Sequence, residues 1–143
     1  MKTFLTTALM AAVISLGLAS EGLAASLVAR IDIGSQRMTV SEGGRVMYSW
    51  TVSTARKGYR TPRGSYKPTR MHRMWYSRKY DMSPMPYSVF FHGGYAVHGT
   101  GYVKQLGRPA SHGCVRLATG NAAEFYSLVK QHGARNTRII LTN

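Results

Sequence analysis

The sequence has 143 residues, of which 19 are Lys or Arg and 5 are Asp or Glu, so its formal net charge is +14. Its single cysteine excludes an intramolecular disulfide, and its length suits one domain built around one hydrophobic core. A chain this basic attracts anionic polymers, for example a cell envelope, lipid head groups or nucleic acid.

The N-terminus has the pattern of a secretory signal peptide. Lys2 precedes an apolar run from about Leu9 to Ala19, and Gly22-Leu23-Ala24 fits the small-x-small pattern of a cleavage site. The run is shorter than the roughly 20 apolar residues that a transmembrane helix needs. We therefore predict a cleaved signal peptide at 1–24 and a single soluble domain at 25–143, outside the cytoplasm and without a transmembrane anchor. Secretion argues against nucleic acid as the natural partner.

Strand patterns dominate the first two thirds of the predicted domain. "SLVARIDIG", residues 26–34, is rich in β-branched residues and predicts a strand. Residues 36–54 predict a hairpin that turns at Glu42-Gly43-Gly44. "TPRG", residues 61–64, is typical of a turn. Further short, aromatic-rich strands are predicted within 65–76 and 85–99, the latter broken at Gly93-Gly94.

One segment has a helical pattern. "TGNAAEFYSLVKQHG", residues 119–133, offers Thr119 or Asn121 as the N-terminal cap and Gly133 as the stop. Its predicted buried stripe consists of Ala122, Phe125, Leu128 and Val129. "TRIILTN", residues 137–143, predicts a closing strand. The chain is therefore predicted to be mostly β, with one α-helix in its C-terminal half.

Residues 56–79 form a basic segment, with nine Lys or Arg, no acidic residue and interleaved aromatic side chains. Such a mixture can grip single-stranded nucleic acid. It can also be an ordinary solvated face, which is the interpretation we favour because charge runs usually have that role. A third interpretation is that the segment holds the protein against an acidic envelope.

The cysteine, Cys114, lies in the polar stretch "SHGCVRL", residues 111–117. Only a thiolate attacks carbonyl groups well, so a reactive cysteine needs a base or a positive charge nearby. His98, His112 and Arg116 are candidates close along the chain. Cysteines of secreted proteins are commonly paired, which makes an unpaired one a candidate nucleophile.

Two other interpretations of Cys114 stay open at this point. A lone cysteine is often a small buried hydrophobe, although glycine and charged neighbours are unusual in a core strand. Cys114 could also join His92, His98 and His112 as zinc ligands, although their spacing matches no common zinc signature. We favour a structural role for His92 in a strand, and we place His72 and His132 on the surface.

Three motifs together resemble a known family. "HGT" at 98–100, "GRPASHGCVRL" at 107–117 and "TPRG" at 61–64 are similar to the L,D-transpeptidase catalytic domain of bacterial cell-wall enzymes, the YkuD family. The resemblance runs from about Leu27 to Asn143. It implies a β-sandwich-like fold of mixed sheets with one helix and no metal or organic cofactor. The predicted signal peptide implies a periplasmic location.

The resemblance also implies roles for individual residues. The catalytic residues would be Cys114 as nucleophile, His98 as general base and Gly99, whose backbone carbonyl orients the imidazole. Backbone N–H groups around His112, Gly113 and Cys114 would form the oxyanion hole, with Ser111 and Arg116 in substrate binding.

The implied reaction is acyl transfer on peptidoglycan stem peptides. Cys114 would attack the carbonyl of the third residue of a tetrapeptide stem, meso-diaminopimelate, and release D-alanine. An amine would then resolve the thioester, giving a 3→3 cross-link or tethering an envelope protein. Alternatives are an L,D-carboxypeptidase or hydrolase that uses water, and a non-catalytic module that binds cell wall or metal.

Overall fold

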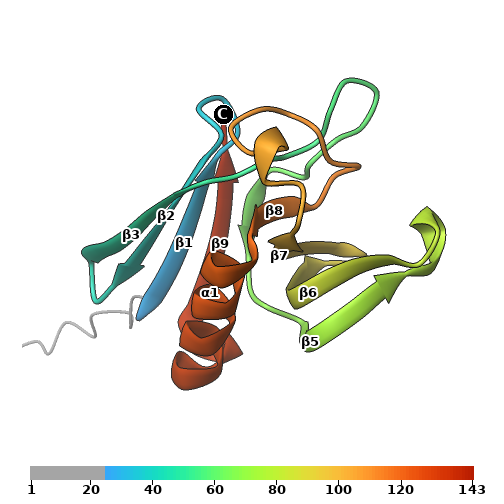
Figure 1. Cartoon of the computed structure of the whole chain (residues 1–143). Coiled ribbons are helices and arrows are strands. Elements are labelled where there is room, and N and C mark those ends of the chain that lie inside the picture. The colour runs from blue at the N-terminus through green and yellow to red at the C-terminus, as the bar shows by residue number, and fades with distance from the viewer. Residues whose placement is uncertain (1–24) are drawn as a thin grey trace, which may run out of the picture.

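The computed structural model describes residues 25–143, and the predicted signal peptide at 1–24 lies outside the described residues. Within these described residues, two β-sheets and one α-helix make up the fold (Figure 1). One sheet has the strand order β3-β2-β1-β9-β4 and the other has the order β5-β6-β7-β8. The predicted fold class, mostly β with mixed sheets and one helix, is confirmed.

The five-stranded sheet consists of β1 (Leu27–Asp32), β2 (Arg37–Glu42), β3 (Arg45–Thr51), β4 (Gly64–Tyr66) and β9 (Thr137–Thr142). The predicted first strand and hairpin are confirmed, with Gly43 and Gly44 in the turn, both at positive φ. β1 pairs antiparallel with β2 and parallel with β9, so the chain ends beside its first strand.

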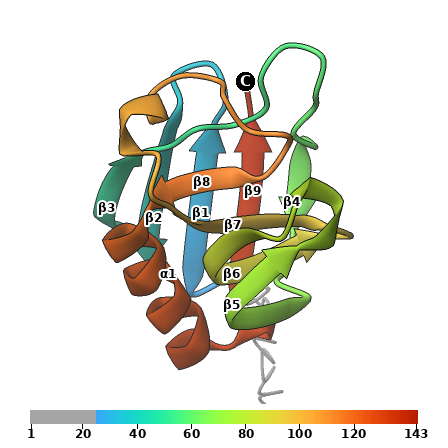
Figure 2. The ribbon, with the colours of Figure 1, turned by 45° about the vertical axis from the view of Figure 1, so that its right-hand side comes forward.

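The four-stranded sheet consists of β5 (Arg70–Ser77), β6 (Ser83–His92), β7 (Tyr95–Thr100) and β8 (Val115–Ala118). β5, β6 and β7 are antiparallel neighbours, with the predicted turn at Gly93-Gly94, whereas β7 and β8 are parallel. Short 3₁₀ helices follow β5 (η1, Arg78–Tyr80), β7 (η2, Val103–Gln105) and the α-helix (η3, Ala134–Asn136). This sheet lies across the face of the five-stranded sheet (Figure 2).

The helix α1 (Thr119–His132) packs against β6, β7 and β8, and buries the predicted stripe of Ala122, Phe125, Leu128 and Val129. Gly133 ends it at φ 86°, as predicted. The prediction of a cap at Thr119 or Asn121 is wrong, because the N-cap is Ala118 and no side chain caps the first turn. The helix begins directly where β8 ends, so the strand itself supplies the residue before the first turn.

The core lies between the two sheets and the helix. Its buried side chains include Ile31 of β1, Ile139 of β9, Val97 of β7, Leu117 of β8 and Phe125 of α1. A domain of this size depends on one such shared core for its stability. In the described part of the chain, no helix is long and apolar enough to cross a membrane.

Candidate active site

The parallel strands β7 and β8 bring the predicted site residues together. Their register sets Val97 beside Val115 and His98 beside Arg116. Since side chains of a strand alternate between its two faces, the two valines enter the core, and His98 and Arg116 lie on the opposite face. Cys114 comes immediately before β8, two residues from Arg116, and so lies on the same face as both.

This face opens into a cleft of about 730 Å³. His98, Cys114 and Arg116 line it from β7 and β8, and His112 lines it from the loop before β8. The opposite wall is the β5–β6 hairpin, which contributes Arg70, Trp75, Arg78, Lys79 and Tyr80 among others. The cleft therefore brings together four of the sequence-predicted residues. It also adds a basic, aromatic wall, which the sequence motifs did not link with these four residues.

His98 is held as a neutral imidazole. The residue is 6% exposed, and Nδ1 lies 2.7 Å from the carbonyl oxygen of Gly99. A carbonyl oxygen can only accept, so Nδ1 carries the proton and Nε2 is the ring atom able to accept another. Burial lowers the pKa of His98 to about 4; the positive charge of Arg116 also lowers it, and the bond to Gly99 opposes the shift. At neutral pH the ring is thus an unprotonated base.

Cys114 is half-buried at the edge of the cleft. Its sulfur lies 3.8 Å from the carbonyl oxygen of Gly94, and its side chain packs against a small apolar cluster that includes Phe90 and Ala96. Burial raises the pKa of the Cys114 thiol, while a hydrogen bond from the Ala96 backbone and the charge of Arg116 oppose the rise. The sulfur faces the cleft rather than the core between the sheets, so the interpretation of Cys114 as a core hydrophobe does not fit the structure.

Ser111 shapes the turn that carries Cys114. Its side chain is fully buried; Oγ donates to the carbonyl oxygen of Cys114 at 2.6 Å and accepts from the N–H of Gly113 at 3.0 Å. With no exposed atom, Ser111 cannot contact substrate in this arrangement, and we correct the prediction that it binds substrate. Because the N–H of Gly113 is already donated to Ser111, the N–H groups of His112 and Cys114 are the candidates left for an oxyanion hole.

Both the backbone conformation and the lack of room for a Cβ atom require glycine at position 113. Its φ is 134°, a value that other residues rarely adopt. A Cβ atom there would lie 2.5 Å from Cε1 of Tyr95 and 2.9 Å from the carbonyl oxygen of Arg60. The turn before Cys114 is therefore pressed against β7 and against the loop that contains Arg60.

That loop also reaches the turn through Thr61, which was predicted only to be part of a turn within one of the family motifs. The buried Oγ1 of Thr61 donates to the carbonyl oxygen of Gly113 at 2.8 Å and accepts from the N–H of Ala55 at 3.0 Å. The "TPRG" motif thus supplies a brace for the turn of Cys114. Its presence among the family motifs was the only sequence signal of this role.

Arg116 is fixed at both its backbone and its side chain. Its backbone exchanges hydrogen bonds with Ser53 at 2.9 and 3.0 Å, and Nη1 donates to Oε1 of Gln105 at 3.3 Å. Burial lowers the pKa of Arg116, although a guanidinium remains charged at neutral pH. It therefore brings a fixed positive charge next to His98 and Cys114.

His112 faces the tip of the β5–β6 hairpin. Its ring stacks on Tyr80 of η1, with centroids 4.0 Å apart and planes 14° apart, and meets Tyr59 edge-on at 4.8 Å. Burial lowers the pKa of His112, as do the charges of Arg56, Arg116 and Lys79. No local sequence pattern linked His112 with Tyr80, which is 32 residues earlier in the chain.

The other histidines lie outside the cleft lining. His92 is exposed at the end of β6, and the prediction that it belongs to a strand is confirmed. His72 and His132, which were predicted to lie on the surface, are each half-buried and thus partly exposed. The His72 ring packs on Trp75, and Nε2 of His132 lies 2.9 Å from a carboxylate oxygen of Glu42. Among residues 25–143, no group of three His, Cys, Asp or Glu could hold a metal ion.

The Lys and Arg residues of the basic segment 56–79 are exposed, yet part of the segment belongs to the cleft. Arg70, Arg78 and Lys79 line the cleft wall, whereas its other lysines and arginines do not. The favoured interpretation as a solvated face therefore describes most of the segment but not these three residues.

Comparison with known proteins agrees with the motif resemblance. Residues 26–140 match the family model of the L,D-transpeptidase catalytic domain (YkuD), so the chain belongs to this family. A search of curated proteins finds no match to the chain.

Solved structures share the fold. An L,D-transpeptidase from Mycobacterium smegmatis is 24% identical with a TM-score of 0.71, over 82% of this chain and 59% of that one. The L,D-transpeptidase LdtMt1, in a structure with imipenem, is 24% identical with a TM-score of 0.72, over 82% of this chain and 59% of that one. An L,D-transpeptidase from Xylanimonas cellulosilytica is 28% identical with a TM-score of 0.71, over 84% and 62%. The chain thus spans about three fifths of each of these proteins.

Proposed function

We propose that this protein is a peptidoglycan L,D-transpeptidase with Cys114 as its nucleophile. The observation that carries the proposal is that a neutral, buried imidazole and the only thiol of the chain line one cleft, on the same face of β7 and β8, in a member of this family. The substrate is the tetrapeptide stem of peptidoglycan. Residues 1–24 are the cleaved signal peptide and 25–143 the catalytic domain, which acts in the periplasm without an organic cofactor.

The first half of the reaction begins from a neutral pair. As the sulfur of Cys114 attacks the L-centre carbonyl of diaminopimelate, its proton passes to Nε2 of His98. The Gly99 carbonyl, 2.7 Å from Nδ1, stabilises the imidazolium that forms. Backbone N–H groups at His112 and Cys114 stabilise the developing oxyanion. His98 then gives its proton to the leaving amine of D-alanine, and a thioester remains.

The second half transfers the acyl group. An amine, from a second diaminopimelate or from an envelope protein, loses a proton to His98 and attacks the thioester. The sulfur leaves and takes the proton back from His98, which restores the neutral pair. The fixed charge of Arg116 helps to hold a substrate carboxylate in the cleft. If water takes the place of the amine, the same steps produce an L,D-carboxypeptidase.

Mass spectrometry of the 25–143 protein tests the proposal. A disaccharide-tetrapeptide should form an adduct on Cys114 with loss of D-alanine, and imipenem should form an adduct at the same residue. Cys114→Ala should form neither, and His98→Gln should form both much more slowly, by about 10²–10⁴-fold. No adduct on Cys114 with either compound would contradict the proposal. The products made with an added amine show whether an amine or water completes the reaction.

A further inference from the structure

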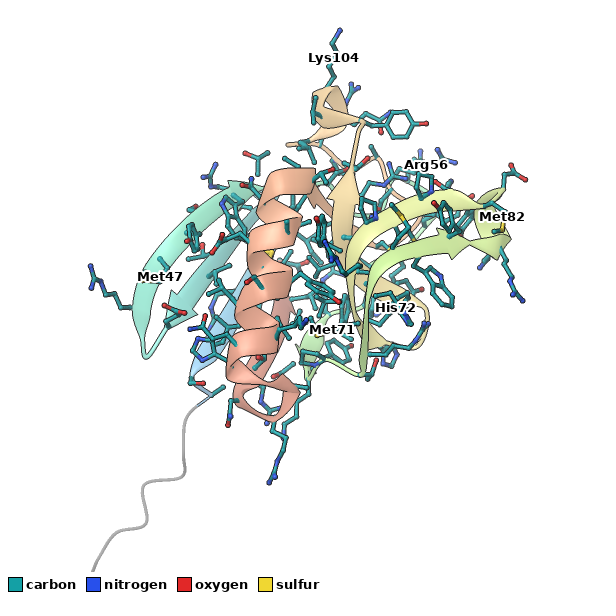
Figure 3. The ribbon with its side chains drawn as sticks, turned by 60° about the horizontal axis from the view of Figure 1, so that its bottom comes forward. Met47, Arg56, Met71, His72, Met82 and Lys104 are labelled. Carbon is teal, nitrogen blue, oxygen red and sulfur yellow. The ribbon has the colours of Figure 1, made fainter. Side chains whose placement is uncertain are left out.

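Arg70, at the start of β5, is held on an aromatic platform in the cleft wall. Its Cζ lies 3.6 Å from the ring centroid of Phe90 and 4.7 Å from that of Trp75. The two rings pack edge-to-face at 5.6 Å, and Phe90 is almost completely buried. Because both rings are fixed by packing, they also fix the plane of the guanidinium. Figure 3 shows the strand that carries it, with Met71 and His72 labelled.

Among residues 25–143, the guanidinium of Arg70 has no acidic partner. Within residues 25–143 the only contact between a basic and an acidic side chain at ion-pair distance is that of His132 with Glu42. The side chain of Arg70 instead lies 3.4 Å from Nε2 of His72. A guanidinium stacked by its face keeps its N–H donors directed outward in its own plane. Arg70 is exposed and therefore retains donors for a ligand in the cleft.

The electrostatics of the cleft favour an anion near Arg70. Among the side chains that line the cleft, Arg70, Arg78, Lys79 and Arg116 are cations, and Asp81 is the carboxylate. Like charges gathered around one cleft raise the local concentration of anionic ligands. Arg70 differs from the others because stacking on two rings gives its fork a set orientation, which suits the two oxygens of a carboxylate.

An apolar floor connects Arg70 with Cys114. Phe90, which lies under the guanidinium, belongs to one small cluster with Met85 and Ala96, and both Trp75 and Cys114 pack against that cluster. A ligand that reaches from the sulfur to Arg70 would therefore pass over aliphatic and aromatic surface. Stem peptides combine these features, since short aliphatic chains in them separate the reacting carbonyl from side carboxylates.

We propose that Arg70, with Trp75 and Phe90 beneath it, forms a carboxylate subsite that selects acyl donors by a side carboxylate of the stem. The inference rests on the proposed function. The carboxylate is either the α-carboxylate of the stem glutamate or the second carboxylate of diaminopimelate. Both have the same chemistry, and substrates amidated at one position or the other distinguish them.

Arg70→Gln, with Arg73→Gln as the matched control, tests the subsite. Arg73 lies on the same strand, is exposed and does not line the cleft, so the control removes the same charge from outside it. Acylation of Cys114 is followed with the free stem and with each singly amidated stem. Arg70→Gln should raise KM for the free stem by about 10–100-fold, the value of a charge-assisted bond, with little change in kcat. Arg73→Gln should change KM by less than about twofold.

The pattern across substrates identifies the bound carboxylate. One of the two amidations should raise KM of the wild-type protein as much as Arg70→Gln raises KM for the free stem. On that amidated stem, Arg70→Gln should raise KM no further. Equal losses for Arg70→Gln and Arg73→Gln, or an Arg70→Gln loss that persists on both amidated stems, would overturn the subsite. Alkylation of Cys114 by uncharged iodoacetamide at the wild-type rate shows that the variant has an intact site. If no stem acylates Cys114 of the wild-type protein, the proposed function is overturned and the subsite with it. If Cys114 of both variants is acylated as in the wild-type protein, the subsite alone is overturned.

Discussion

Thr61→Val removes the one side-chain hydroxyl that joins the "TPRG" loop to the turn of Cys114. Thr61 is 3% exposed, and its Oγ1 both donates to the carbonyl oxygen of Gly113 and accepts from the N–H of Ala55. Valine has nearly the same shape, so the substitution opens no cavity and leaves these two backbone groups without a partner.

The expected cost follows from the two groups that lose their bonds. A buried polar group left unpaired costs about 1–3 kcal/mol, so two would cost about 2–6 kcal/mol. Ala55 is half-buried, and water can partly replace its lost partner, so we expect the free energy of unfolding to fall by about 2–4 kcal/mol. Urea denaturation measures this as a lower midpoint with an unchanged slope.

Thr61→Ser is the matched control, since it keeps the hydroxyl and loses one methyl group. Thr61→Ser should lower the free energy of unfolding by about 1 kcal/mol. Because Gly113 directly precedes Cys114, Thr61→Val should also slow acylation of Cys114 by at least about tenfold, while Thr61→Ser stays near wild type. If the two variants unfold within about 0.5 kcal/mol of each other and acylate equally fast, Thr61 does not brace the turn.

Two further predictions concern the pair of His98 and Cys114 and the turn that carries Cys114. Because burial lowers the pKa of His98 to about 4, its imidazole stays unprotonated in mild acid, and the rate of Cys114 acylation should fall only as the pH approaches about 4. An acidic limb near 6.5, the ordinary value for histidine, would contradict this assignment. Gly113→Ala should lower the free energy of unfolding by about 1–3 kcal/mol and slow acylation, because its Cβ would overlap the Tyr95 ring. Gly120→Ala in the first turn of α1, where nothing lies within 4 Å of the added Cβ, is the control and should not destabilise the protein; equal unfolding energies for the two variants would refute the steric argument.

The sequence alone was sufficient for features that depend on near neighbours. Alternating apolar residues predicted β1, where Leu27, Ala29 and Ile31 are buried, and the stripe of α1 followed from helical spacing. The turn at Gly93-Gly94 followed from residue type. The motif residues His98 and Cys114 were also recognised from sequence, since the resemblance rests on short stretches of contiguous residues.

Local patterns failed where a neighbouring element replaced the expected partner. Thr119 was expected to cap α1, but β8 runs straight into the helix and leaves Ala118 at that position. Ser111 was expected to meet substrate, but the turn folds its hydroxyl onto Gly113 and Cys114. In both cases the residue type suited the predicted role, and the path of the backbone decided otherwise.

Tertiary structure decided which distant residues meet in the cleft. The parallel register of β7 and β8 places His98 beside Arg116, and folding of the β5–β6 hairpin brings Tyr80 onto His112 and Arg70 onto Phe90. These partners are separated by 18 to 32 residues, and no short-range spacing encodes their contact. Their contact, and the lowered pKa of His98, depend on how two sheets bury a shared core, which is a property of the whole chain rather than of any segment.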